Sequence, residues 1–302
     1  MPGRADGADI LGDMATPAQW VAGARPRTLP AAAAPVLVGS GAAAHAGAFD
    51  GGRALLALGV ALALQVGVNY ANYYSDGIRG TDADRVGPLR LTASLLAPAK
   101  QVKLAAFAAF GVGALLGLWL VALSGQWWLL AVGVACVAAG WFYTGGSKPY
   151  GYLGLGEIFV FVFFGLVATI GTTYTQVGHV TWPSVVGAVA IGLVACAILM
   201  VNNIRDIPTD VVAGKRTLAV RLGDHKARRA YVGMVAGSWV LALTCIFASP
   251  WVLGVALLGL PVVLLCIPVL AGARGKLLVP VLGGTGFYEL ALGALLGLGL
   301  AL

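Results

Sequence analysis

Two stretches rich in aspartate and asparagine carry the side chains best suited to bind a metal ion. The first stretch, residues 69–90, reads NYANYYSDGIRGTDADRVGPLR, and the second stretch, residues 202–223, reads NNIRDIPTDVVAGKRTLAVRLG. Both contain Asn-x-x-x-Asp, and residues four apart lie on one face of a helix. Mg²⁺ is commonly held by one or two carboxylates together with substrate phosphates. The two stretches therefore predict divalent cations that hold a polyanion.

The candidate metal ligands are the oxygen-bearing side chains of these stretches: Asn72, Asp76, Asp82, Asn202, Asp206 and Asp210. Their aspartates can also balance neighbouring arginines or cap helices, and Asp84 can simply pair with Arg85. An exposed ion pair contributes under about 1 kcal/mol, however, so stability alone explains this concentration of charge poorly. Pro208 disfavours a helix at the residue before it, which predicts Asp210 in a loop.

Basic residues of the same stretches are candidates for contacts with phosphate oxygens, because Arg presents a planar fork and Lys a point charge. They are Arg79, Arg85, Arg90, Lys215 and Arg216. The alternative is that they are juxtamembrane charges that orient the protein and bind anionic lipid. Arg25 and Arg27, in ARPRTLP, are candidates for binding a carboxylate.

A third polar region reads WFYTGGSKPYGYLGLGEIFVFVFFG and gathers Tyr143, Lys148, Tyr150, Tyr152 and Glu157. Aromatic residues at a membrane interface usually form an anchoring belt, but they can also line an apolar tunnel or stabilise a carbocation. Carboxylates within a membrane are costly and face a cavity or a partner. The deeper Glu289 is either a proton relay or a hydrogen-bonded packing residue.

The composition places these residues in a polytopic membrane protein. Of the 302 residues, 59% are hydrophobic and 10% charged, which is too apolar for a soluble domain. A span needs about 20 apolar residues. We therefore predict an all-α bundle of nine transmembrane helices, at residues 28–45, 53–75, 102–123, 127–143, 153–175, 183–204, 230–248, 251–270 and 277–300.

The basic residues predict the orientation of the bundle. If the N-terminus lies in the cytoplasm, every Lys and Arg except Arg53 falls in a cytoplasmic segment. Both aspartate stretches then also face the cytoplasm. This placement explains the net charge of +7 without nucleic acid as a partner. Richness in Gly and Ala suggests a bacterium with a GC-rich genome, and we expect the protein in its inner (cytoplasmic) membrane.

The chain is predicted to form one transmembrane domain, residues 23–302. Residues 1–22 are polar and contain no hydrophobic region of a signal peptide. We expect this leader to be disordered.

The two stretches resemble the aspartate-rich motifs of the UbiA-type intramembrane prenyltransferases, most closely the menaquinone branch of that superfamily. ARPRTLPAAAAPVLVGS and YTGGSKPYGYLGLGEIFVFVFFG are similar to the same branch. Its first motif is usually N-x-x-x-D-x-x-x-D. Here Gly80 replaces the last Asp, Asp82 follows two residues later, and Tyr73 stands where many relatives have Asp. The second motif, D-x-x-x-D, fits Asp206 and Asp210.

The resemblance implies nine helices around a central, lipid-accessible cavity that the two motifs cap, and a polyprenyl diphosphate and 1,4-dihydroxy-2-naphthoate as substrates. The hypothesis is that two Mg²⁺ ions on the six candidate ligands hold the diphosphate, while basic residues share its charge. The allylic carbocation is then attacked by the naphthoate ring, which loses CO₂ and a proton to give a demethylmenaquinol. The remaining candidates are Lys148 for catalysis and Asn69, Tyr143 and Tyr150 for substrate binding.

Two alternatives stay open from the sequence. The first is the same chemistry with another acceptor, such as 4-hydroxybenzoate, a homogentisate-like ring, haem or chlorophyllide. The second is a secondary transporter, because transporters also combine repeats, glycine-rich spans and buried carboxylates.

Overall fold

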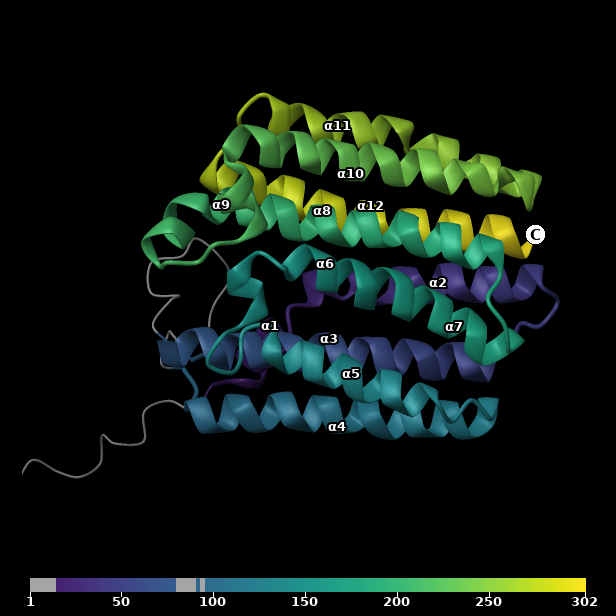
Figure 1. Cartoon of the computed structure of the whole chain (residues 1–302), viewed down its shortest axis with the longest axis horizontal. Helices are drawn as coiled ribbons and strands as arrows, with labels where there is room; N and C mark the ends of the chain where they lie inside the picture. The colour runs from purple at the N-terminus through teal and green to yellow at the C-terminus, as the bar shows by residue number, and fades with distance from the viewer. Residues whose placement is uncertain (1–14, 80–90, 93–95) are drawn as a thin grey trace, which may run out of the picture.

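The computed structural model describes residues 15–79, 91–92 and 96–302, and every regular element in these residues is helical. The longer helices run side by side, so that their ends gather at two opposite ends of a bundle (Figure 1). The main helices are α1 (Pro17–Gly23), α2 (Pro30–His45), α3 (Gly51–Arg79), α4 (Ala99–Ser124), α5 (Leu129–Phe142), α6 (Gly156–Val160), α7 (Ala168–Val177), α8 (Trp182–Val212), α9 (Leu218–Leu222), α10 (Asp224–Thr244), α11 (Gly259–Leu270) and α12 (Leu278–Ala301). A π-helical segment, Phe161–Val167, joins α6 to α7. The 3₁₀ segments are Pro26–Thr28, Tyr150–Leu153, Cys245–Phe247, Pro250–Leu258 and Gly275–Leu277.

In the described part of the chain, seven helical stretches are long and apolar enough to cross a membrane. They are Gly51–Arg79, Ala99–Ser124, Gly156–Val177, Trp182–Val212, Asp224–Phe247, Pro250–Leu270 and Gly275–Ala301. The other two expected spans correspond to α2 and α5, which have 16 and 14 residues and fall short of the usual length of about 20. The prediction of an all-helical membrane protein is therefore confirmed, whereas nine full-length spans are not.

The end of the polar leader folds into α1. Thr16 accepts a hydrogen bond from the Gln19 amide at 3.3 Å, and the Gln19 side chain accepts one from the Thr16 amide at 2.7 Å. This capping box satisfies two amide groups that a helix N-terminus otherwise leaves unpaired. The expected disorder is thus wrong for residues 17–22, while residues 1–14 lie outside the described part of the chain.

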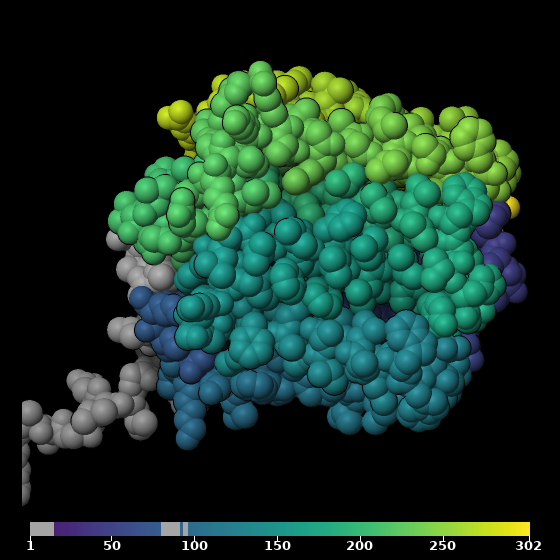
Figure 2. All heavy atoms as spheres, viewed as in Figure 1, coloured from purple at the N-terminus to yellow at the C-terminus, as the bar shows by residue number. Residues whose placement is uncertain are grey.

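α3 and α8 are the longest helices, with 29 and 31 residues. Because a span takes about 20 residues, both exceed the hydrocarbon thickness, and their last turns carry the candidate aspartates. α8 runs through the middle of the bundle, between α10 and α12 on one side and the π-helical segment on the other. In the space-filling view, neighbouring helices touch over most of the visible face (Figure 2).

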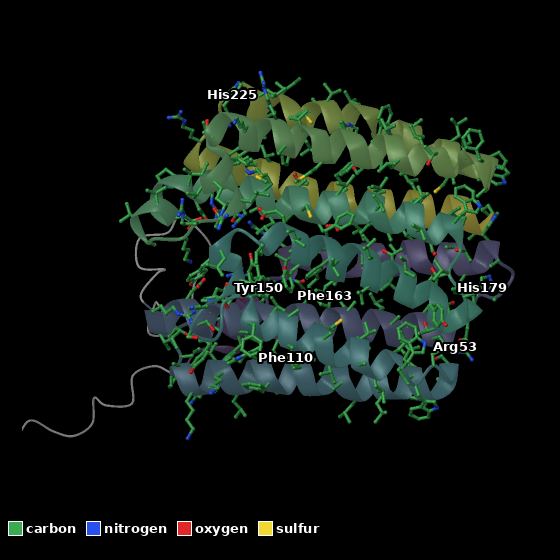
Figure 3. The ribbon with its side chains drawn as sticks, in the orientation of Figure 1. Arg53, Phe110, Tyr150, Phe163, His179 and His225 are labelled. Carbon is green, nitrogen blue, oxygen red and sulfur yellow. The ribbon has the colours of Figure 1, made fainter. Side chains whose placement is uncertain are left out.

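The two ends of the bundle differ in charge. Arg53 lies at one end, where it pairs with Asp50 at 3.3 Å and donates to the Leu123 and Thr175 carbonyls. His179 lies at the same end, opposite Tyr150 (Figure 3). The other described basic residues lie at or near the end that carries α9. This asymmetry matches the distribution of basic residues that predicts the orientation of the chain.

A glycine seam joins α2 to α12. A Cβ atom added to Gly41 would lie 2.2 Å from the Gly297 carbonyl oxygen, and one added to Gly293 would lie 2.8 Å from the Ala34 Cα atom. Small residues at such positions allow two helix backbones to approach closely, which drives helix association in lipid. The seam fixes α2 against α12.

Glu289 lies in α12 and is fully buried. Neither of its carboxyl oxygens has a hydrogen-bond partner among the described residues. It is therefore not the hydrogen-bonded packing residue that one reading of the sequence suggests, and its role as a proton relay stays a prediction.

Replacement of Gly41 by Ala should destabilise the protein by roughly 1–3 kcal/mol or more, because the methyl group would collide with the α12 backbone. The matched control is Gly133→Ala in α5, where an added Cβ meets nothing within 4 Å. Alanine also favours helix over glycine, so Gly133→Ala should be neutral or slightly stabilising. Thermal unfolding in detergent compares the two; equal melting temperatures would contradict the importance of the seam.

Candidate active site

One face of α3 carries a row of polar residues. Gln65, Asn69, Asn72 and Asp76 are spaced by four, three and four residues, so their side chains line one side of the helix. All except Asn72 are buried. Unpaired polar groups are costly in an apolar bundle, so each member of this row needs a partner or a ligand.

Asp76 contacts the second stretch through Lys215. The Lys215 ammonium lies 3.6 Å from Asp76 Oδ1, and both side chains are almost completely buried. Tyr152, between α5 and α6, donates its hydroxyl to the same oxygen, and its ring centroid lies 4.3 Å from the ammonium. The Tyr152 carbonyl accepts a hydrogen bond from the backbone amide of Arg216 at 2.9 Å. Residues from both stretches therefore meet around one tyrosine.

The connection between α5 and α6, which contains Tyr152, also contacts the last turns of α3. The Thr144 hydroxyl donates to Asn72 Oδ1 at 2.8 Å. Arg79 donates to the carbonyls of Thr144 and Gly146, and its guanidinium carbon lies 5.7 Å from the Tyr152 ring centroid. Arg79 thus holds the connection in place at the exposed end of the helix.

The second stretch contains its own charge cluster at the end of α8. Arg205 donates to both carboxylate oxygens of Asp206, at 2.7 and 2.8 Å, and to Asn202 Oδ1 at 2.9 Å. The Arg205 and Asp206 side chains are only 6% and 3% exposed. Two predicted ligands are therefore oriented by one guanidinium.

Asp210 lies within α8, so the prediction that Pro208 places it in a loop is wrong. The helix continues to Val212, and Asp210 is buried one turn beyond Asp206. Proline is tolerated in membrane helices because neighbouring groups satisfy the backbone that it leaves unpaired. Asp206 and Asp210 consequently share one helical face.

The connection between α1 and α2 is braced against α3. Arg25 donates its Nε–H to the Tyr73 hydroxyl at 2.9 Å, and its guanidinium carbon lies 4.4 Å from that ring centroid. Its backbone has φ 52°, a left-handed conformation that is uncommon for a residue with a side chain. Asn69 donates to the Ala24 carbonyl at 2.8 Å and to Thr28 Oγ1 at 3.0 Å. Asn69, a predicted substrate-binding residue, therefore positions this connection.

The remaining described candidates are placed differently. Arg27, Lys148 and Arg216 have exposed side chains. Tyr143 and Tyr150 are partly buried, with their ring centroids 5.5 Å apart. The other candidates, Asp82, Arg85 and Arg90, lie outside the described residues, as does the ambiguous Asp84.

Tyr150 begins an aromatic row that follows α6 into the bundle. Its ring stacks on Phe159 with the ring centroids 4.0 Å apart, and Phe159 stacks on Phe163 with the centroids 6.1 Å apart. The two ends of the row, Tyr150 and Phe163, are labelled in Figure 3. The Tyr150 hydroxyl donates to the Ala139 carbonyl at 2.7 Å. Burial raises the pKa of Tyr150 above its ordinary value, so this phenol remains a neutral donor.

The donor set fits Mg²⁺ in its chemistry, because α3 and α8 both bring carboxylate and amide oxygens to the end of the bundle that carries α9. Within the described ranges, no three His, Cys, Asp or Glu side chains form a group that can hold a metal ion. An ion at this site would therefore need phosphate oxygens, and Mg²⁺ bound by one or two carboxylates usually has them.

Three residues with central contacts were not among the predicted site residues: Tyr152, Thr144 and Arg205. Tyr152 was noted only as a member of an aromatic group that is typical of a membrane interface. A tyrosine offers both a hydrogen-bond donor and a face for a cation. The sequence carries no local signal for this role, because the partners Asp76 and Lys215 lie far from Tyr152 along the chain.

A comparison with protein families identifies the chain. The profile of the UbiA prenyltransferase family matches residues 32–279. The chain belongs to this family. Membership confirms the resemblance that the two aspartate stretches indicated.

Curated relatives and solved structures agree with this assignment. The 1,4-dihydroxy-2-naphthoate octaprenyltransferase of Mycobacterium tuberculosis is 55% identical over 278 residues, which cover 92% of this chain and 94% of the relative. The enzyme of the same name from Escherichia coli is 42% identical and covers 76% and 77%. A UbiA homolog from Archaeoglobus fulgidus bound to GPP and Mg²⁺ has a TM-score of 0.62 at 15% identity, covering 93% of this chain and 99% of that one. The last likeness concerns the fold alone.

Replacement of Tyr152 by Phe should destabilise the protein by about 1.5–3 kcal/mol, because Asp76 loses a hydrogen bond to its charged oxygen. Tyr152→Leu should cost more, since Lys215 then also loses an aromatic face. The matched control is Tyr174→Phe, whose ring packs edge-on against Trp128. Thermal unfolding in detergent ranks the three variants; a Tyr152→Phe protein as stable as the control would show that this contact has little weight.

Proposed function

We propose that the protein transfers a polyprenyl group from polyprenyl diphosphate to 1,4-dihydroxy-2-naphthoate, with release of CO₂ and diphosphate, to give a demethylmenaquinol in menaquinone biosynthesis. The names of the relatives from Mycobacterium tuberculosis and Escherichia coli support this substrate pair. The structural observation that carries the proposal is the meeting of Asp76 and Lys215 beside Tyr152. It brings acidic and basic side chains of both stretches to one end of an apolar bundle, as binding of a prenyl diphosphate requires.

The diphosphate binds at this end of the bundle. Its oxygens accept hydrogen bonds from the cationic side chains of Lys215, Arg79 and Arg216. The sequence adds Arg85 to these candidates. Two Mg²⁺ ions belong to this proposal, and the residues that would hold them are Asn72, Asp76, Asn202, Asp206 and Asp210, with Asp82. When bound, Mg²⁺ neutralises negative charge that develops on the leaving diphosphate.

The acceptor binds next to α3, with its carboxylate at Arg25. The Nε–H group of Arg25 is used by Tyr73, while its terminal amino groups have no hydrogen-bond partner among the described residues. A guanidinium presents parallel N–H donors that match a carboxylate. The contact with Tyr73 and the fixed left-handed backbone orient this donor before the acceptor arrives.

The reaction breaks the bond between the first prenyl carbon and the diphosphate oxygen. The ring carbon that bears the carboxyl group forms a bond to this prenyl carbon. The carboxyl group then leaves as CO₂ with loss of its proton, and the electron pair restores the aromatic ring. The apolar helices exclude water from the allylic cation, and the Tyr150–Phe159–Phe163 row offers π faces that stabilise positive charge.

The bundle crosses the membrane nine times, with the diphosphate site at its cytoplasmic end. α2 and α5 complete nine spans around a lipid-accessible cavity that holds the isoprenoid tail. The end with α9 faces the cytoplasm of a bacterium, because it carries nearly all of the positive charge. A transporter is disfavoured, since its charged site would lie near the middle of the membrane rather than at one end.

Replacement of Asp76 or Asp206 by Asn should lower prenyl transfer by roughly 10²–10³-fold, because each change removes a charged ligand from the diphosphate site. The control is Asp50→Asn, which breaks an ion pair at the opposite end of the bundle and should keep activity. Activity of purified protein is measured with and without a chelator. Full Mg²⁺-dependent transfer by both site variants would refute the assignment.

Mass spectrometry of the lipid product tests the acceptor. Purified protein supplied with a polyprenyl diphosphate and 1,4-dihydroxy-2-naphthoate should form a product without the carboxyl group, whereas 4-hydroxybenzoate should not be prenylated. CO₂ release should match product formation one to one. Prenylation of 4-hydroxybenzoate instead would keep the enzyme class and overturn the naphthoate assignment.

A further inference from the structure

Gln65 has a buried carbonyl oxygen that meets no donor within the described part of the chain. The residue lies in α3 and is only 7% exposed. Its Oε1 atom has no hydrogen-bond partner among the described residues. Buried amide oxygens normally accept at least one hydrogen bond, from protein or from a bound molecule.

The orientation of this amide is set by its neighbours. Asn69 donates its amino group to the Ala24 carbonyl, so its own oxygen points toward Gln65 Nε2 at 3.4 Å. Thr28 donates its hydroxyl to the Arg25 carbonyl at 2.9 Å and therefore accepts from Gln65 Nε2 at 3.1 Å. A flipped Gln65 would place its oxygen against two acceptors. The amide nitrogen is thus committed to the protein, and the oxygen remains for a donor from elsewhere.

The position of Gln65 indicates what that donor is. Gln65 shares the polar face of α3 with Asp76, eleven residues and about 16 Å further along the helix. A ring that attacks the prenyl carbon must lie deeper in the bundle than the diphosphate at Asp76. Thr28 links Gln65 to the Arg25 carbonyl, and Arg25 is the proposed carboxylate donor. A hydroxyl on the same ring is the donor that this arrangement leaves for Gln65 Oε1.

We propose that Gln65 is a specificity-determining residue that accepts a hydrogen bond from a ring hydroxyl of the aromatic acceptor. This inference rests on the proposed function and names a contact within it. An amide oxygen selects a hydroxyl donor without adding charge to a carbocation site. A site built around such a bond rejects an analogue that lacks the hydroxyl, because its own buried oxygen is then left unpaired.

The test compares two acceptor analogues, 1-hydroxy-2-naphthoate and 4-hydroxy-2-naphthoate, each of which lacks one hydroxyl. Their competitive inhibition constants against 1,4-dihydroxy-2-naphthoate are measured for the wild-type protein and for Gln65→Met. The wild type should prefer the analogue that keeps the contacting hydroxyl, and Gln65→Met should change the ratio of the two constants by about tenfold. The KM for the polyprenyl diphosphate should not change.

The matched control is Gln176→Met. Gln176 is also 7% exposed and hydrogen-bonded, but it contacts Asp50 and Thr172 at the opposite end of the bundle. Its loss should leave the ratio unchanged even if it lowers stability. This control separates recognition of a hydroxyl from general damage caused by removing a buried amide.

If the ratio of the two inhibition constants is unchanged in an active, folded Gln65→Met protein, the inference is overturned. This result is expected if Gln65 Oε1 binds a water molecule rather than the acceptor. If Gln65→Met does not fold, Gln65→Asn supports the same comparison, because it withdraws the oxygen by one methylene and keeps the amide. A wild type that does not prenylate 1,4-dihydroxy-2-naphthoate would instead refute the proposed function. The two failures are therefore distinguishable.

Discussion

The buried ion pair between Asp76 and Lys215 is the constraint on which the site depends. Removal of two charges from water is expensive, and their attraction repays this only when further contacts satisfy both groups. Tyr152 does so with its hydroxyl on one side and its ring on the other. The pair therefore contributes little net stability. Its main effect is to hold α3, the segment after α8 and the connection that contains Tyr152 in one arrangement.

The same requirement explains the cluster at the end of α8. Arg205 binds Asp206 and Asn202 before any ligand is considered, so these oxygens are already desolvated and oriented. Under the proposed function, a diphosphate that enters with its cations would meet a network whose desolvation cost was met during folding. Such preorganisation is the main electrostatic advantage that a protein site has over water. The contrast is Glu289, which is buried without a described partner and contributes to neither cluster.

The sequence predicted the placement of the charged stretches better than their contacts. Helix alternation and basic residues were enough to bring Asp76 and Asp206 to the same end. The predicted loop at Asp210 was wrong because Pro208 disfavours a helix at the preceding residue without forbidding it, and α8 continues past Pro208 to Val212. The spans at α2 and α5 were counted from apolar content, but the helices that form there have only 16 and 14 residues. Tyr152 was not predicted as a site residue because its role depends on residues far away in the sequence.

The polar face of α3 carries residues of both proposed binding sites. Its row of four polar residues is costly in an apolar bundle, and the protein satisfies most of it: Asp76 through Lys215 and Tyr152, Asn72 through Thr144, Asn69 through Ala24 and Thr28. In this row, Gln65 Oε1 is left without a hydrogen-bond donor among the described residues. Because a helix is rigid over eleven residues, the spacing from Asp76 to Gln65 fixes the depth of the acceptor relative to the diphosphate. Alignment of the two reactants would thus follow from the helix itself and would need no moving part.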